Sequence, residues 1–165
     1  QYENVSSVKV SGFEGEVSYQ YKDDLRIQVN CSYQDARDMN KYKEDGKPSI
    51  TYNNKLPNRP WLFSNVEADY IFRDVLKNGD KLKLSYHYQY VHWFYLTWEA
   101  YGSLDGKSKI PTQHQHNAVV SYSWNNERYN VSLGCNNLFD KELYDNFMLQ
   151  KPGRSFFAKF RIFIN

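Results

Sequence analysis

The feature that most constrains the fold of this chain is an alternation of apolar and polar residues that recurs seven times. In FFAKFRIFIN, at residues 156–165, every second residue from Phe156 to Ile164 is apolar, and the positions between them include Lys159 and Arg161. Successive side chains of a β-strand point to opposite faces, so this pattern predicts strands with one apolar and one polar face. The seven expected strands cover about residues 8–22, 24–36, 62–73, 80–98, 116–125, 128–138 and 156–165.

The connections between the expected strands alternate in length. Those after the first, third and fifth strands are short, whereas residues 37–61, 99–115 and 139–153 form long loops. Turn-forming pairs such as Asp45-Gly46 and Asn125-Asn126 occur in both kinds. We therefore expect an antiparallel meander with short turns at one end and long loops at the other. Residues 38–45 (DMNKYKED) are compatible with a short helical turn in the first long loop.

Composition leaves two classes of all-β protein open. Aromatic residues make up 18% of the chain, with 15 Tyr and 10 Phe, which favours strands. The net charge of +2 argues against a nucleic-acid-binding protein, which normally has a strong basic bias. The mean hydropathy is −0.80, and no stretch approaches the roughly 20 apolar residues of a membrane helix. The alternation therefore fits either a soluble antiparallel barrel or sandwich, or a transmembrane barrel.

Strand length, charge placement and loop length favour the transmembrane barrel. The expected strands exceed the length of about 5–6 residues usual in soluble proteins and match the roughly 9–11 residues that cross a bilayer at a tilt. Charges on the polar stripes, such as Glu14, Arg26 and Lys83, suit a wet lumen. Tyr and Trp near the ends of the apolar stripes are typical of interfacial girdles, and the long loops are expected outside the cell.

A membrane-embedded sheet must close, because backbone groups in lipid have to be paired within the protein. Bacterial barrels normally have an even number of strands, and the alternation indicates seven here, or eight if one is missed. We therefore predict an all-β fold, an antiparallel transmembrane β-barrel segment that is part of a larger barrel. Taken alone, such a segment has two unpaired sheet edges.

Three motifs resemble TonB-dependent outer-membrane receptors. They are GFEGEVSYQY after NVSSVKV, LPNRPWLFSNVEADYIF at residues 56–72, and CNNLFDKELYDNF followed by PGRSFFAKFRIFIN at the end of the chain. The third is the most specific, because it is similar to the N-N-L-F-D-K and P-G-R pattern that precedes the last strand in that family. The chain ends in Phe163-Ile164-Asn165, whereas members of the family usually end in Phe.

The resemblance implies that residues 1–165 are the C-terminal part of a 22-stranded receptor barrel, with the plug domain and the N-terminal strands outside this chain. It implies active transport of a scarce nutrient (siderophore-iron, haem, cobalamin or a glycan) across the outer membrane of a Gram-negative bacterium. The implied partners are outer-membrane lipid, the remaining barrel and plug segments of the same protein or a companion chain, the small nutrient ligand, and TonB acting through the absent N-terminal region. No nucleic acid and no cofactor are expected, and the chain is not expected to be an enzyme.

Two other functions remain open from the sequence. One is a passive porin or adhesin barrel, which would lack the plug. The other is a soluble β-barrel binding protein, similar to a lectin or lipocalin. The soluble alternative requires that the side of the last strand bearing Phe156, Phe160 and Ile162 be buried in a protein core.

The candidate ligand-binding residues of the outer loops and vestibule are Trp93, Tyr95, Tyr101, His114, His116 and Tyr144. Trp93 and Tyr95 are suited to stacking on sugar or catechol rings, although the outer aromatic girdle is the alternative role for this segment. His114 and His116 are separated by one residue and so share a face of an extended segment. Two histidines without a third ligand do not make a metal site, so a polar strand entrance is their alternative role.

Other conspicuous residues are expected to be structural. Asn136, Asn137 and Asp140 are placed to fix the exit from the sixth strand through local hydrogen bonds, and Arg154 to anchor the last hairpin. The two cysteines, Cys31 and Cys135, fall on apolar stripes of strands that are not neighbours, so no disulfide is expected. No catalytic set is evident in the sequence.

Overall fold

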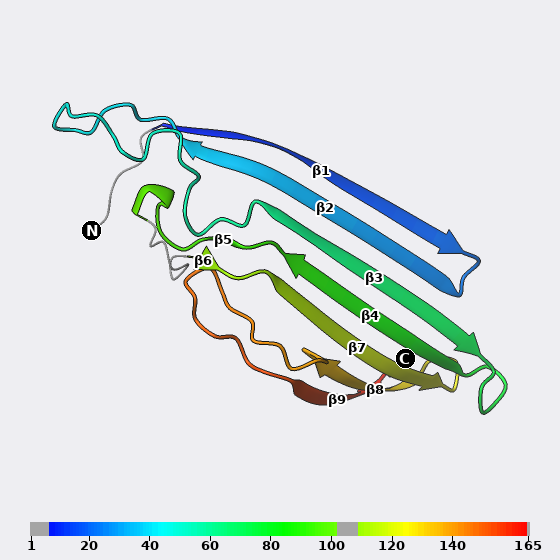
Figure 1. Ribbon diagram of the computed structural model, residues 1–165. Helices are drawn as coiled ribbons and strands as arrows, with labels where there is room; N and C mark the ends of the chain where they lie inside the picture. Colours follow the sequence, from blue (N-terminus) through cyan, green and yellow to red (C-terminus); the bar gives the residue numbers. More distant parts are fainter. Residues whose placement is uncertain (1–6, 102–108, 165) are drawn as a thin grey trace.

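The computed structural model describes residues 7–101 and 109–164. The protein forms one antiparallel sheet with the strand order β1-β2-β3-β4-β7-β8-β9, curved along its width (Figure 1). Its strands are β1 (Val8–Tyr21), β2 (Leu25–Asp38), β3 (Leu62–Arg73), β4 (Lys81–Val91), β7 (Gln113–Trp124), β8 (Tyr129–Asn136) and β9 (Ser155–Ile162). A small second sheet pairs β5 (Phe94–Tyr95) with β6 (Lys109–Ile110), and a 3-10 turn, η1, covers Glu99–Tyr101.

The all-β, antiparallel fold and the seven strands of the meander are confirmed, with two local corrections. The strand expected at 80–98 is too long, because β4 ends at Val91 and Phe94 pairs instead with Ile110 in the small sheet. Phe94 is 1% exposed and Ile110 is fully buried, so an apolar contact between residues distant in the sequence overrides the alternation. The helical turn expected at 38–45 is wrong: Tyr42 bridges Pro48, and this segment folds back on itself as a small loop.

Cross-strand register keeps one apolar face continuous across all seven strands. Residues that are direct partners on neighbouring strands point to the same side of a sheet. One row of such partners crosses the whole sheet and contains Tyr19, Ile27, Ala68, Tyr86, Ala118, Cys135 and Phe156. Side chains on this face are largely uncovered, and Val17 is 70% and Phe160 59% exposed.

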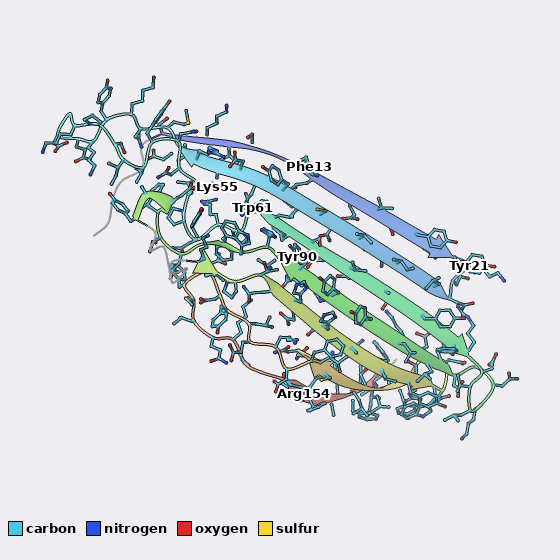
Figure 2. The ribbon with its side chains drawn as sticks, viewed as in Figure 1. Phe13, Tyr21, Lys55, Trp61, Tyr90 and Arg154 are labelled. Carbon is cyan, nitrogen blue, oxygen red and sulfur yellow. The ribbon has the colours of Figure 1, made fainter. Side chains whose placement is uncertain are left out.

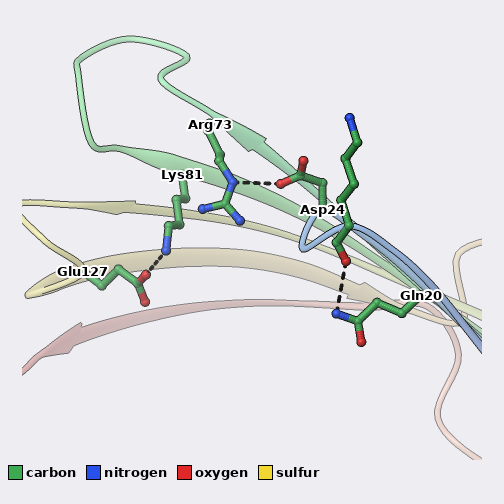
Figure 3. Close-up of polar contacts among 6 residues, drawn as sticks. Gln20, Asp24, Arg73, Lys81 and Glu127 are labelled. Carbon is green, nitrogen blue, oxygen red and sulfur yellow. Dashed lines mark hydrogen bonds and ion pairs between the residues drawn. The ribbon is translucent and has the colours of Figure 1, made fainter.

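The opposite face is polar and bonded to itself. The row adjacent to the one above contains Gln20, Arg26, Asp69, Ser85, Val119, Gly134 and Phe157. Asp69 accepts a hydrogen bond from Ser85 (2.6 Å) and forms an ion pair with Lys83 (3.1 Å). At the short-turn end, Arg73 binds Asp24 (2.8 Å) and Lys81 binds Glu127 (Figure 3). Gln20 donates to the carbonyl of Lys22 in the same view.

No second layer covers the apolar face within the described residues. The buried apolar side chains there are only Ala36, Phe94, Ile110, Cys135 and Leu143, most of them at the long-loop end. The strands β1 and β9 lie at opposite edges and do not pair with each other, so the prediction of two open edges is confirmed (Figure 1). Among the described residues, no helix is long and apolar enough to span a membrane.

The turn between β3 and β4 is held by one buried carboxylate. Asp80 is 2% exposed and accepts backbone N–H groups of residues 75–77 at distances between 2.7 and 3.0 Å. The hydroxyl of Tyr122, on β7, also donates to it. Burial alone would raise the pKa of Asp80, but the hydrogen bonds from Tyr122 and the backbone outweigh it and lower the pKa below its ordinary value. This clasp fixes the short-turn end of β3, β4 and β7 together.

Candidate functional site

The three long connections lie at the same end of the sheet and contact one another there (Figure 1). Asn58, in the loop after β2, donates its backbone N–H to the carbonyl of Tyr95 (2.8 Å). With its amide nitrogen facing carbonyl groups, the Asn58 side chain also donates to Leu96 (2.8 Å) and to Asn146 (2.9 Å). Asn58 has a positive φ of 58°, which Asn tolerates better than most residues. One residue thus joins the loops after β2, β4 and β8.

An aromatic cluster with two lysines lies at this end; we call Trp61, His92, Trp93 and Tyr95 with Lys55 and Lys109 the loop aromatic cluster. Trp61 packs edge-on against His92 (ring centroids 4.4 Å apart) and Trp93 (6.1 Å). Trp93 packs in the same way against Tyr95 (5.4 Å). Figure 2 shows Lys55 and Trp61 close together at the loop end of the sheet.

Both lysines lie over aromatic faces. The Lys55 ammonium is 4.1 Å from the ring centre of Trp61, and that of Lys109 is 4.6 Å from Trp93 and 5.5 Å from Tyr95. These distances are within the range of cation–π attraction. The cluster therefore presents flat rings together with positive charge, a chemistry suited to a planar or sugar ligand that carries an anionic group.

Two buried polar atoms of this part of the sheet lack a hydrogen-bond partner among residues 7–101 and 109–164. They are the indole N–H of Trp61 and one carboxylate oxygen of Asp35. The other Asp35 oxygen pairs with the Arg37 guanidinium at 2.7 Å. The sequence analysis missed Trp61, whose only local signal is its place after Pro60 in the motif that leads into β3.

Of the predicted ligand residues, Trp93 and Tyr95 are brought together. The Tyr95 hydroxyl donates to Glu99 (3.2 Å), and burial followed by the charge of Glu99 raises the pKa of Tyr95. Trp93 contacts Trp61 and His92, and His92 bonds to Tyr90 of the apolar face. Trp93 thus lies beside residues that continue the apolar face, so a place in the outer aromatic girdle remains the alternative to ligand stacking for this residue.

Tyr101 and Tyr144 lie in the loops but apart from Trp93. Tyr101 ends η1 and is 48% exposed. The backbone N–H of Tyr144 donates to the side-chain oxygen of Gln113 (2.6 Å). The Tyr144 hydroxyl donates to Glu142 (3.0 Å), a bond that raises the pKa of Tyr144. Within the described part of the chain, no ring contact links either tyrosine to the loop aromatic cluster.

The two predicted histidines lie on the apolar face. His116 is the cross-strand partner of Tyr88, and His114 is the partner of Tyr90. His114 and His116 also follow the same alternate positions of β7 as Val120 and Ala118. They do not face the polar side, and this favours their role as a polar strand entrance over ligand binding in a lumen. In residues 7–101 and 109–164, no group of three His, Cys, Asp or Glu side chains is placed to hold a metal ion.

The residues expected to be structural have that role. The Asn137 side chain donates to the carbonyl of Lys141 (2.8 Å) and accepts from its N–H (2.9 Å), which closes the exit from β8. Asp140 accepts the backbone N–H of Arg154 (2.8 Å) and so links that exit to the start of the last hairpin strand. Cys31 and Cys135 are both free, as expected.

Comparison with protein families gives one match. The model of the family described as "TonB dependent receptor-like, beta-barrel" matches residues 1–138, which is most of the chain. A search of curated proteins gives no match. The family consists of receptors and transporters of the outer membrane and not of enzymes. The two-faced antiparallel sheet with long loops at one end is the architecture expected of such a barrel wall. The chain therefore belongs to the β-barrel family of the TonB-dependent receptors.

Proposed function

We propose that this chain forms the C-terminal wall of an active outer-membrane importer in a Gram-negative bacterium. The observation that carries the proposal is the pairing of an uncovered apolar face with a self-bonded polar face, in a member of this receptor family. Lipid would cover the apolar face, and the polar face would border a water-filled interior. The remaining strands, the plug and the N-terminal region that engages TonB would lie outside residues 1–165.

In this mechanism the wall is a rigid conduit and the long loops capture the nutrient. Cross-strand hydrogen bonds such as Asn65 to Asn30 (2.9 Å) and Ser121 to Ser132 (2.8 Å) stiffen the polar face. The polar groups of this face would also remain hydrated by the water of the interior. A pull from the periplasm, transmitted through TonB, would displace the plug and open the path. The wall itself would change little during transport.

The ligand class follows from the loop aromatic cluster. Trp93 and Tyr95 would stack on a planar or sugar ring, and Lys109 would pair with an anionic substituent. Tyr101 and Tyr144 would contribute at the rim of the loops. Catecholate siderophores, haem and cobalamin each combine ring groups with an anionic group, whereas a neutral glycan supplies only a ring face for stacking. His114 and His116 are not included as ligand contacts, because of the face on which they lie.

Uptake by the intact receptor tests this function. A strain without the receptor gene is compared with its parent on a ferric siderophore, haem, cobalamin or an oligosaccharide as the limiting source. We expect loss of growth on one of the four and restoration by the full-length gene, but not in a strain without TonB. Growth that is restored without TonB would identify a passive porin. Retained growth on all four sources would contradict the importer function for these nutrients.

The loop site is tested in the same strain. The variant Trp93→Ala/Lys109→Ala removes one ring and one cation, and Tyr42→Ala, in the loop after β2, is the matched control in another part of the loops. We expect the double variant to lower nutrient affinity about tenfold or more, because stacking and charge pairing are both lost. Equal affinity of the two variants would remove the loop aromatic cluster from the binding site.

A further inference from the structure

The apolar face carries a cluster of hydrogen-bonded tyrosine and histidine side chains that has no role in the proposed transport function. Three tyrosines of β4 and three histidines interleave there: Tyr86, Tyr88, Tyr90, His92, His114 and His116, which we call the Tyr–His ladder. Tyr86 bonds to Nδ1 of His116 (2.6 Å) and Tyr88 to Nδ1 of His114 (2.8 Å). Tyr90 bonds to Nδ1 of His92 (2.6 Å). Figure 2 shows Tyr90 near the end of β4 that adjoins the long loops.

The ladder rings also contact each other between the pairs. Tyr88 lies 4.8 Å from His116, and Tyr90 lies 5.3 Å from His114, measured between ring centroids. Tyr88 and Tyr90 thus each contact two histidines, and in the described part of the chain Tyr86 contacts His116 alone. Phe139, from the loop after β8, packs edge-on against His116 at 4.8 Å. The ladder is therefore an ordered surface and not a set of independent side chains.

Hydrogen-bond counting shows what the ladder offers. A neutral histidine has one N–H and one acceptor nitrogen, and a tyrosine hydroxyl has one O–H. If the hydroxyl donates to Nδ1, the histidine keeps a free Nε2–H; if Nδ1–H donates, the tyrosine keeps a free O–H. In either arrangement each pair retains one donor. Among the described residues, Nε2 of His114 and of His116 has no hydrogen-bond partner.

The height of the ladder along the strands places it at the boundary between the acyl chains and the lipid headgroups. Trp124 and Tyr129 stack at 5.5 Å at the short-turn end and mark the inner aromatic girdle. Eight residue steps separate Trp124 from His116 and ten separate it from His114, which are heights of about 20 Å and about 26 Å for a strand tilted by about 40°. An apolar band about 25 Å tall would therefore end between these two histidines. At this height the free donors meet lipid headgroups.

A groove gives these donors a place to act. Val66, Tyr86, Tyr88, His114 and His116 line an open groove of about 250 Å³ on this face. The two pairs in the groove, Tyr86–His116 and Tyr88–His114, provide two donors side by side. None of the groove's lining residues is acidic, so nothing there repels an anion. Its floor is apolar at Val66, which suits the start of an acyl chain.

We propose that the Tyr–His ladder binds the phosphate of an outer-leaflet lipid headgroup. Two adjacent donors would hold non-bridging phosphate oxygens, and the acyl chains would continue along the bare apolar face below. This inference rests on the membrane location in the proposed function but is independent of the nutrient. It assigns to β4 and β7 a fixed lipid at the outer boundary of the membrane.

The test uses the full-length receptor in nanodiscs of phosphatidylcholine doped with a trace of either phosphatidic acid or a galactosyl diacylglycerol. Retained lipid is counted by native mass spectrometry after release from the nanodisc. We expect wild type to retain phosphatidic acid, and the fourfold variant Tyr86→Phe/Tyr88→Phe/His114→Phe/His116→Phe to retain it about tenfold less, because four aromatic rings stay but every donor of the two pairs is lost. Tyr19→Phe/Tyr70→Phe, on the same face near the short-turn end, is the matched control and is expected to behave as wild type.

Other outcomes overturn the inference in distinct ways. Equal retention of the galactolipid by wild type would show that sugar hydroxyls and not phosphate are recognised. Equal retention of phosphatidic acid by the fourfold variant and the control would remove the ladder from the site. A change in oligomer mass in the fourfold variant would identify the ladder as a protein interface. If the fourfold variant does not fold, Tyr86→Phe/His116→Phe, which removes every donor of one pair, replaces it. Failure of the receptor to enter nanodiscs at all would contradict the membrane location itself.

Discussion

The two faces of the sheet are built from neighbouring residues of the same strands, yet they satisfy their chemistry in opposite ways. On the polar face, side chains bond to each other across strands, as Asp69 does with Ser85 and Lys83. On the apolar face, side chains such as Val17 and Phe160 have no covering layer in the described residues. In a soluble protein the apolar face would be buried in a core and the polar face would contact water outside. Here the apolar face is uncovered in the described residues, so its apolar surroundings have to be supplied by something other than these residues.

The largest expected effect comes from placing a charge on the apolar face. Val120→Lys puts an ammonium in the middle of the apolar band, which costs about 2–4 kcal/mol in a membrane barrel. Val119→Lys is the matched control on the adjacent, polar-face position. Urea unfolding of the full-length receptor in lipid vesicles, followed by tryptophan fluorescence, measures both. Equal destabilisation by the two variants would contradict the assignment of the faces.

The next effect comes from Phe157, an aromatic residue of the polar face whose ring lies over Gly134. A Cβ at Gly134 would lie 2.2 Å from the ring of Phe157, so Gly134 leaves the space that this ring occupies. Gly134→Val should destabilise the barrel by about 1–3 kcal/mol through overpacking. Phe157→Ala/Gly134→Val should recover much of that loss in the same unfolding assay. A double variant that is no more stable than Gly134→Val alone would show that the ring is not the cause.

The short-turn end should depend on acid through Asp80. Its pKa in the folded protein is lowered, so its stabilising contribution is complete above the unfolded pKa of about 3.9 and is lost as the pH falls through the folded value. We expect hydrogen-exchange protection in the turn at 74–80, taken relative to the intrinsic exchange rate at each pH, to fall in this acid range in wild type. Asp80→Asn should show faster exchange already at neutral pH and little further acid dependence. Acid dependence that is the same in both proteins would rule out Asp80 as its source.

The smallest effect is expected from an exposed ion pair on the polar face. The ion pair between Lys81 and Glu127 links the start of β4 to the turn after β7 (Figure 3). Because both side chains are in contact with solvent, Glu127→Gln should cost about 0.5 kcal/mol or less, and salt should abolish the difference. Unfolding midpoints at low and high salt test this. A loss that persists at high salt would indicate that the pair is shielded from water.

The sequence predicts the faces better than it predicts the loops, and the reason is physical. Alternation is local, so every strand of the main sheet could be found from its own residues. The end of β4 could not, because Phe94 leaves the alternation to meet Ile110, which lies outside its local window. Trp61 was missed for the same reason, since its contacts with His92 and Trp93 come from another loop.

The histidines of β7 show a signal that was present but not used. Every second residue counted back from Trp124 through Val120 leads to His116 and His114, and so places them on the apolar face. Their polarity suggested a loop or a vestibule instead. The strand register agrees with the two-residue period and not with the polarity of the side chains. The polarity is accommodated on this face because tyrosines of β4 hydrogen-bond to Nδ1 of each ring.

The central claim is that apolar positions contact lipid and the adjacent polar positions contact enclosed water. Nitroxide labels at Val120→Cys and Ser121→Cys, in a full-length receptor with Cys31→Ser and Cys135→Ser, test it directly in lipid vesicles. We predict that position 120 is relaxed mainly by oxygen, which concentrates in acyl chains, and position 121 mainly by a water-soluble nickel chelate. Low accessibility of position 120 to both reagents would place the apolar face in a protein core and would contradict the account.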